Sequence, residues 1–118
     1  MRRISGEQCL MRIFIGDSDR YQHRPLHEAL ADLFKSNGFA GLTVLRGIAG
    51  FGAHSVYHTH KLLDLSSDLP IILEVVESRE RINALMPKID AMINGGLVTL
   101  ETVEVVRYRH CHEGECGE

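Results

Sequence analysis

The segment RGIAGFGAHS, residues 46–55, decides how this chain is organised, because three glycines follow directly on a β-branched stretch. Glycine destabilises a strand by about 0.5–1 kcal/mol relative to alanine, so glycines at 47, 50 and 52 require a physical reason. One reason is a bulge that ends a strand with nothing bound. The other is that some group must come very close to the backbone.

Upstream of the glycines, a strand and a helix are predicted. The residues 10–19 (LMRIFIGDSD) alternate between two faces until the polar turn 16–19 ends the strand. Pro25 suits the first position of a helix, where its missing N–H is harmless. Apolar residues then recur at helical spacing over 26–34, and Gly38 supplies the C-terminal stop.

Around the glycines, two strands are separated by a long connection. The first strand is predicted over 41–49 and the next over 69–78, where the apolar run LPIILEVVES is nearly continuous. Such a run indicates cover on both faces of the strand or burial in an assembly. About twenty residues, 50–69, join these strands, although a hairpin loop needs only about two to five residues. Connections of this length in compact domains are usually functional or mobile.

A second helix and a fourth strand complete the prediction. Ser78 can cap a helix, and Pro87 inside that helix should kink it or split it in two. The apolar stripe of the helix is Ile82, Leu85, Ile89, Met92 and Ile93. Gly95-Gly96 ends the helix, and residues 97–109 form the last strand.

The order of elements, β-α-β-β-α-β, predicts an α+β, ferredoxin-like fold with an antiparallel four-stranded sheet and a long loop between strands two and three. Two helices on one face leave the other face bare, so we expect packing against further copies of the chain. The formal net charge of −3 disfavours nucleic acid as a partner. No apolar run approaches the roughly 20 residues of a membrane span, and the N-terminus lacks a signal-peptide core, so a cytoplasmic location is expected.

Several motifs resemble those of PII-like signal-transduction proteins. One large bacterial and archaeal PII-like family carries an Ile-Gly-(Asp/Glu)-Ser-Asp start, an Arg-Gly-x-x-Gly-Phe-Gly-x-His-Ser turn and a Ser-x-Asp-Leu-Pro entry to strand three. This chain has all three, as IGDSD (15–19), RGIAGFGAHS (46–55) and SSDLP (66–70). LEVV (73–76) and VRYR (106–109) also resemble PII strands. The resemblance covers residues 9–109, expected to be a single domain, and leaves 110–118 as a flexible tail.

The resemblance implies a nucleotide site between subunits. PII proteins are homotrimers that bind adenine nucleotides in clefts between neighbours, and the occupied state orders a T-loop that follows a Gly-Phe-Gly turn. By position, Thr43 and Val76 would line the adenine pocket, and the guanidinium groups of Arg107 and Arg109 would pair with phosphate oxygens. The backbone that approaches the ribose and phosphates would be that of Gly50, Phe51 and Gly52.

The chain departs from PII proteins at the phosphate end of this site. Where PII has Arg-Gln after the glycine turn, this chain has Ala53-His54, and its loop 94–101 is shorter and contains no Lys or Arg. A site poor in cations should hold a triphosphate weakly, so AMP or ADP, or a cyclic or otherwise modified adenylate, is favoured. No other cofactor is required. His54 is expected to hydrogen-bond the ligand, and Arg46 and Gly47 at the root of the loop complete the candidate site.

In PII families the long loop addresses a partner, usually a membrane transporter or channel. Here a nucleotide between subunits would select one conformation of the loop 53–69, which the partner reads. Arg107 and Arg109 alternate on the predicted last strand and therefore share one face. Taken alone, two arginines at a strand end are more typical of a solubilising surface, and the resemblance shifts the interpretation toward phosphate binding. The chain is not expected to be an enzyme, because no nucleophile, base and orienting group occur at a suitable spacing.

The tail HCHEGECGE (110–118) concentrates soft metal ligands, namely His110, Cys111, His112 and Cys116. It is a flexible terminus, a ring closed by a disulfide, or a site for Zn²⁺ or Cu⁺. A bicarbonate-transporter-associated branch of PII-like proteins is similar in carrying two tail cysteines at this spacing. The alternative function is therefore a metal- or redox-responsive protein that acts through this tail and the loop histidines.

Overall fold

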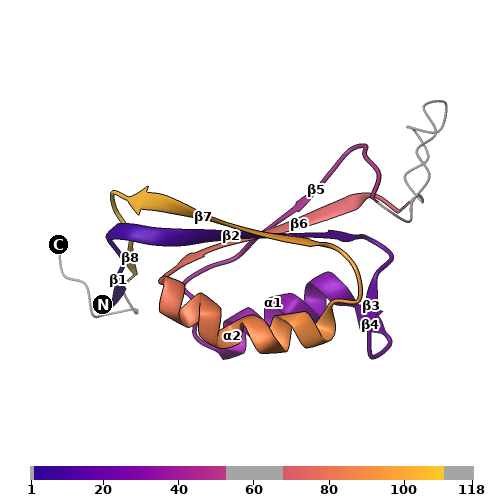
Figure 1. Cartoon of the computed structure of the whole chain (residues 1–118), viewed down its shortest axis with the longest axis horizontal. Helices are drawn as coiled ribbons and strands as arrows, with labels where there is room; N and C mark the ends of the chain where they lie inside the picture. The colour runs from indigo at the N-terminus through magenta and orange to yellow at the C-terminus, as the bar shows by residue number, and fades with distance from the viewer. Residues whose placement is uncertain (1, 53–67, 111–118) are drawn as a thin grey trace.

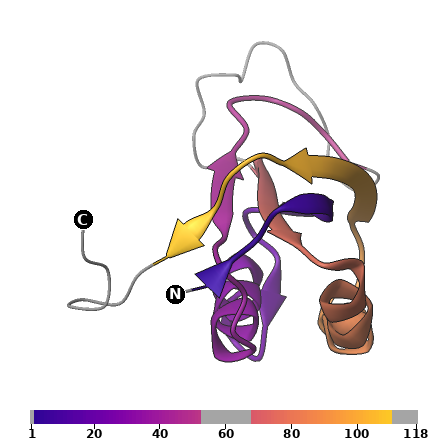
Figure 2. The same ribbon diagram turned by 90° about the vertical axis from the view of Figure 1, so that its left-hand side faces the viewer.

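An antiparallel sheet of four strands, with two helices on one face, forms the body of the chain (Figure 1). The structure is a computed structural model that describes residues 2–52 and 68–110. The strands lie in the order β5-β6-β2-β7, with the bounds Thr43–Arg46, Pro70–Glu77, Gly6–Gly16 and Leu97–Val105. Helices α1 (Leu26–Ser36) and α2 (Arg79–Met92) lie side by side against the sheet (Figure 2). The predicted α+β, ferredoxin-like fold is confirmed.

The hydrophobic core lies between the sheet and the helices, and strand β2 supplies its centre. Alternate side chains of β2 are buried from Cys9 to Ile15, and so are their partners on β6, from Ile71 to Val75. The helices contribute the buried side chains of Leu26, Leu30, Phe34, Ile82, Leu85 and Ile89. The strict alternation on β2 means that its other side chains point away from the helices.

Side chains, rather than further secondary structure, hold the segment between α1 and β5 in place. The buried carboxylate of Glu77 accepts the backbone N–H of Ala40 at 3.1 Å. The Tyr108 hydroxyl donates to the Ala40 carbonyl at 3.3 Å, and the Arg81 guanidinium donates to the Asn37 carbonyl at 2.7 Å. These bonds satisfy backbone groups that would otherwise be left unpaired next to the core.

The first half of the chain differs from the sequence prediction at the ends of its elements. β2 begins at Gly6 instead of residue 10, and β5 has four residues where nine were predicted over 41–49. A short hairpin of β3 (Arg20–Tyr21) and β4 (Arg24–Pro25) comes before α1. It holds Pro25 in an extended conformation, so Pro25 is the N-cap residue and not the first helical residue.

The last predicted strand is two separate strands. β7 ends at Val105, and β8 (Arg109–His110) pairs with β1 (Arg2–Arg3) in a ribbon of its own. The prediction that Arg107 and Arg109 share one face of a single strand is therefore wrong. The two pairings differ in register, because two residues separate Arg3 from Gly6 whereas three separate Val105 from Arg109, so the ladder is interrupted at 106–108.

Helix α2 runs without interruption from Arg79 to Met92, and Ser78 caps it as predicted by accepting the Arg81 N–H at 3.3 Å. Pro87 lies inside the helix on its exposed side, so the predicted split into two helices is wrong. Buried apolar side chains on the opposite side offset the hydrogen bond that proline cannot donate. No helix among the residues that the structure describes is long and apolar enough to cross a membrane.

We expect Pro87→Ala to stabilise the protein by about 1–2 kcal/mol, because it restores the missing helical N–H and removes the ring from the preceding turn. The full helix propensity difference of about 3 kcal/mol is reduced because alanine also frees the unfolded chain. Urea unfolding measures the change. The neighbouring exposed residue provides a control, Lys88→Ala, which should change stability by less than about 0.5 kcal/mol. A loss of stability in Pro87→Ala would contradict the explanation.

Candidate functional site

Three segments far apart in the sequence meet at one end of the sheet. They are the turn 16–19 after β2, the chain after β5, and the residues 68–70 that lead into β6. The Asp17 N–H donates to the Leu69 carbonyl at 2.8 Å, and the Ser18 N–H donates to the Asp68 carboxylate at 2.9 Å. The Gly47 N–H donates to the Pro70 carbonyl at 2.7 Å. The turn and both ends of the segment 53–67 are thus bound to one another.

Close packing against Pro70 and Asp68 explains why glycines occur here. A Cβ atom on Gly47 would lie 2.5 Å from Cγ of Pro70, and one on Gly50 would lie 3.2 Å from the same atom. A Cβ on Gly16 would lie 2.6 Å from the Asp68 carboxylate. The group that approaches the backbone of Gly47 and Gly50 is therefore part of the chain itself.

A cavity of about 710 Å³ opens at this end of the sheet. Its walls come from the turn after β2, from Phe51 and Gly52 at the root of the long loop, and from the connection between α2 and β7. That connection contributes Asn94, Gly95 and Gly96. Gly96 has a φ of +130°, and a Cβ there would lie 2.7 Å from the Phe14 carbonyl, so only glycine fits this wall.

Charged groups around the cavity are mostly paired within the chain. The Asp19 carboxylate accepts the Gly16 N–H at 2.9 Å, and Asp68 accepts the Ser18 N–H. Just outside the cavity, Arg46 donates to Asp17 at 2.9 Å. Arg20 also lines the cavity, and it is the only Lys or Arg among the described lining residues.

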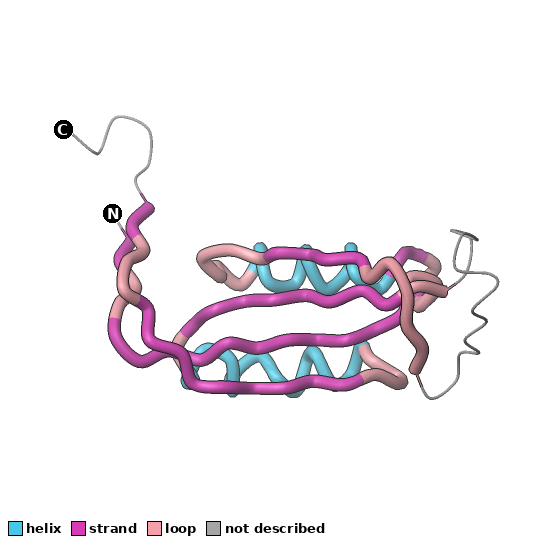
Figure 3. The backbone as a smooth tube through the Cα atoms, turned by 90° about the horizontal axis from the view of Figure 1, so that it is seen from above, coloured by secondary structure: helices cyan, strands magenta, loops and turns pink. Residues whose placement is uncertain are grey.

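A basic ribbon lies at the opposite end of the sheet (Figure 3). In it, Arg2 lies opposite His110 and Arg3 lies opposite Arg109, and the exposed Arg107 lies two residues before β8. The guanidinium groups of Arg3 and Arg109 carry like charges, and like charges placed opposite one another destabilise a strand pair. The eleven-residue strand β2, roughly 35 Å long, separates the ribbon from the cavity.

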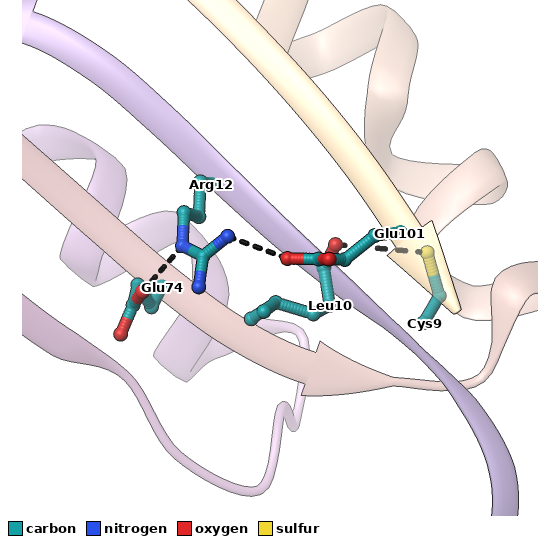
Figure 4. Close-up of polar contacts among 5 residues, drawn as sticks. All are labelled: Cys9, Leu10, Arg12, Glu74 and Glu101. Atoms are coloured by element: carbon teal, nitrogen blue, oxygen red, sulfur yellow. Dashed lines mark hydrogen bonds and ion pairs between the residues drawn. The ribbon is translucent and has the colours of Figure 1, made fainter. Parts of the chain in front are cut away.

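The sheet face that the helices leave uncovered has an ion-pair network at its centre. Arg12 on β2 lies between Glu74 on β6 and Glu101 on β7 (Figure 4). Its Nε donates to Glu74 at 2.6 Å and its Nη1 donates to Glu101. These hydrogen bonds, that to Glu74 first, raise the pKa of Arg12 above its ordinary value. Apolar side chains of the same face surround the network at Leu10, Phe14, Ile72, Val76 and Leu97.

Comparisons with known proteins place the chain in a family and show proteins of the same fold. The family model DUF190, described as "Uncharacterized ACR, COG1993", matches residues 8–105. The chain belongs to the DUF190 family. A UPF0166 protein of Aquifex aeolicus (strain VF5) is 37% identical to it over 97 residues, which cover 82% of this chain and 91% of the relative. A UPF0166 protein of Methanocaldococcus jannaschii is 29% identical over 110 residues, which cover 92% and 95%.

Solved structures of CPII, a nitrogen regulatory PII-like protein from Thiomonas intermedia K12, have the same fold as this DUF190 protein. CPII bound to ADP and bicarbonate matches with a TM-score of 0.55 and 20% identity, over 84% of this chain and 88% of CPII. CPII bound to ADP, AMP and acetate also matches with a TM-score of 0.55, at 18% identity over 88% and 93%. The resemblance to PII-like proteins is confirmed for the fold.

The structure brings together only part of the predicted site of this DUF190 protein. Phe51 and Gly52 line the cavity, and Gly47 and Gly50 lie behind it against Pro70. Arg46 is paired with Asp17. His54 lies outside the described residues.

Four other predicted residues lie away from the cavity of one chain. Thr43 lies on β5 opposite Glu74, and Val76 lies on β6 opposite Leu10, so both belong to the uncovered face. Arg107 and Arg109 belong to the basic end of the sheet. These predicted residues can meet the cavity only if a second copy of the chain supplies them.

Sequence reasoning missed four residues that the structure places at the cavity, Asp19, Arg20, Asp68 and Asn94. The motifs IGDSD and SSDLP, which contain Asp19 and Asp68, could have pointed to them, because both are unusual sequences for strand ends. What the sequence did not reveal is that the two motifs are hydrogen-bonded to each other.

The alternative metal site is not addressed by the described part of the chain. No three His, Cys, Asp or Glu side chains of residues 2–52 and 68–110 come close enough together to hold a metal ion. His110 lies in β8 opposite Arg2, whereas Cys111, His112 and Cys116 lie outside the described residues.

Replacing Gly47 tests the packing explanation. Gly47→Ala should destabilise the protein by about 1–3 kcal/mol, because its Cβ overlaps the Pro70 ring and the root of the loop must shift. The matched control is Gly41→Ala, since a Cβ at Gly41 meets nothing within 4 Å. The control should change the free energy of unfolding by less than about 0.5 kcal/mol or increase it slightly. Equal stability of the two variants in urea unfolding would refute the explanation.

Proposed function

We propose that this DUF190 protein is a PII-like regulator that binds an adenine nucleotide, AMP or ADP in preference to ATP. The observation that carries the proposal is the cavity at the root of the long loop, where the three family motifs meet. Its walls include the backbone of Gly52, Gly95 and Gly96, which a ligand can approach without a side chain in between. The fold likeness to CPII, whose structures hold ADP and AMP, supports the same ligand class. The proposed activity is binding, with no chemical step.

The proposed assembly is a homotrimer in which each nucleotide lies between two copies. The cavity of one chain offers few cations, while the basic ribbon of the same chain lies at the far end of the sheet. A neighbouring copy can bring Arg107 and Arg109 to the ligand, and Thr43 and Val76 to the seam. The uncovered apolar face supplies a surface for this association, and Arg12, held between two carboxylates, fixes a defined charge pattern on it.

The turn 16–19 gives the nucleotide a physical route to the long loop. Gly16 and Asp19 line the cavity, while Asp17 and Ser18 hold the two ends of the segment 53–67 through Arg46, Asp68 and Leu69. A ligand that contacts one arrangement of this turn more favourably than another shifts the loop to the matching conformation. In our proposal a partner protein, a membrane transporter or channel, reads the loop 53–69 in the cytoplasm.

Isothermal titration of the purified protein tests the proposed ligand. We expect AMP and ADP to bind with heat and to raise the melting temperature, and ATP to bind more weakly, because three linked phosphates find few cations in the cavity. Sedimentation of the same sample should give three chain masses. The absence of both heat and a thermal shift with AMP, ADP, ATP and cyclic AMP would overturn the proposal.

Subunit mixing tests whether the site lies between copies. One variant, Gly52→Asp, blocks the cavity, and a second, Arg107→Gln with Arg109→Gln, leaves the cavity intact. Each variant alone should lose AMP binding. After joint unfolding and refolding in equal amounts, about a quarter of the sites should pair an intact cavity with intact arginines, so AMP binding should partly return. If the mixture binds no better than its components, the nucleotide does not lie between copies.

A further inference from the structure

We propose that Arg20 binds the phosphate of the nucleotide, and that the cavity is therefore built for a ligand with a single phosphate. This inference rests on the proposed function and adds to it a residue and a ligand class. Arg20 takes the place of the cation that the loop 94–101 lacks, although it comes from the other side of the cavity, on β3.

The first argument is the charge inventory around the cavity. Three arginines lie near the turn and the hairpin, and two of them are already neutralised within the chain. Arg46 is paired with Asp17 at 2.9 Å, and Arg24 is paired with Asp32 at 2.7 Å. Arg20 forms no ion pair with any residue of the described ranges, and it is the arginine that lines the cavity. Its charge is available to an anionic ligand.

The second argument is that the backbone of Arg20 is held in position before any ligand binds. Arg20 pairs with Pro25 across the hairpin, and the Leu26 N–H donates to the Asp19 carbonyl at 2.8 Å. The tight turn has positive φ values at Gln22 and His23, +49° and +69°. A hairpin closed at both ends limits the conformational freedom that binding must remove, which favours affinity.

The third argument concerns how many phosphates the cavity can accept. Besides Arg20, the charged lining residues are the carboxylates of Asp19 and Asp68, and backbone N–H groups hold both of them in place. A single guanidinium can bind one phosphate through two parallel hydrogen bonds. Phosphates beyond the first would meet these two carboxylates on this side of the site. Their repulsion offsets part of what Arg107 and Arg109 of a neighbouring copy contribute, so each additional phosphate should weaken binding. AMP is the member of the proposed ligand class that fits best.

Arg20→Gln separates this inference from the general proposal when AMP and adenosine are titrated into the full-length protein. In the wild type, AMP should bind more tightly than adenosine. In Arg20→Gln, the AMP affinity should fall by about ten- to a hundredfold, as expected for the loss of a charge-assisted hydrogen-bonded pair, while adenosine binding stays the same. Arg20→Lys, which keeps the charge but loses the bidentate geometry, should lie between the two.

The matched control is Arg24→Gln, on the same hairpin but paired with Asp32 and outside the cavity lining. It should change AMP affinity by less than about twofold, and thermal unfolding of each variant verifies that the fold is kept. If the wild type binds AMP and Arg20→Gln binds it equally well, Arg20 is not a ligand residue, although the proposed function stands. If AMP and adenosine lose affinity together, Arg20 shapes the cavity without binding phosphate. If the wild type binds ADP but not AMP, this inference fails while the proposed function stands. If it binds none of AMP, ADP, ATP and cyclic AMP, the proposed function itself fails.

Discussion

The pairing of β2 along both of its edges is the constraint on which the rest of the structure depends. Because β6 and β7 both hydrogen-bond to this strand, its register decides which side chains of the whole sheet face the helices. It also decides which segments lie at each end. The three family motifs lie at the end marked by Gly16, and the basic ribbon lies beyond the end marked by Gly6. A shift of one residue would exchange the core face for the exposed face.

At the Gly16 end, packing and ligand access rest on the same residues. Pro70 enters β6 so close to the chain after β5 that Gly47 and Gly50 cannot carry a side chain without movement. The turn that lines the cavity is bound to the chain on both sides of the long loop. In the proposed regulator, these direct hydrogen bonds would carry a change in the turn to the loop. The turn therefore links the proposed ligand site directly to the ends of the loop, as a regulator requires.

Two groups of arginines contribute to the proposed site: Arg20, beside the cavity, and Arg107 and Arg109, at the far end of the sheet. The ribbon arginines lie too far from the cavity of their own chain to meet a small ligand there, whereas Arg20 lies beside that cavity in every copy. An arrangement of this kind makes part of the binding energy depend on assembly and part independent of it. The ion-pair network around Arg12 occupies the middle of the face that would be covered. The Arg12 guanidinium is charged at any physiological pH because of its ordinary pKa, and its two carboxylate partners raise that pKa further.

What the sequence by itself determined is local and periodic. The alternation in β2, the Ser78 cap and the apolar stripe of α2 follow from spacing along the chain, and the element order then leaves few folds to choose from. Only the tertiary structure decided that Gly47 must be glycine because of Pro70, that the turn 16–19 holds the ends of the loop, and that Arg20 lies at the cavity. These facts depend on register and through-space approach between segments far apart in sequence. The same holds for the last predicted strand, whose pairing with β2 ends at Val105 and resumes one residue out of register between β8 and β1.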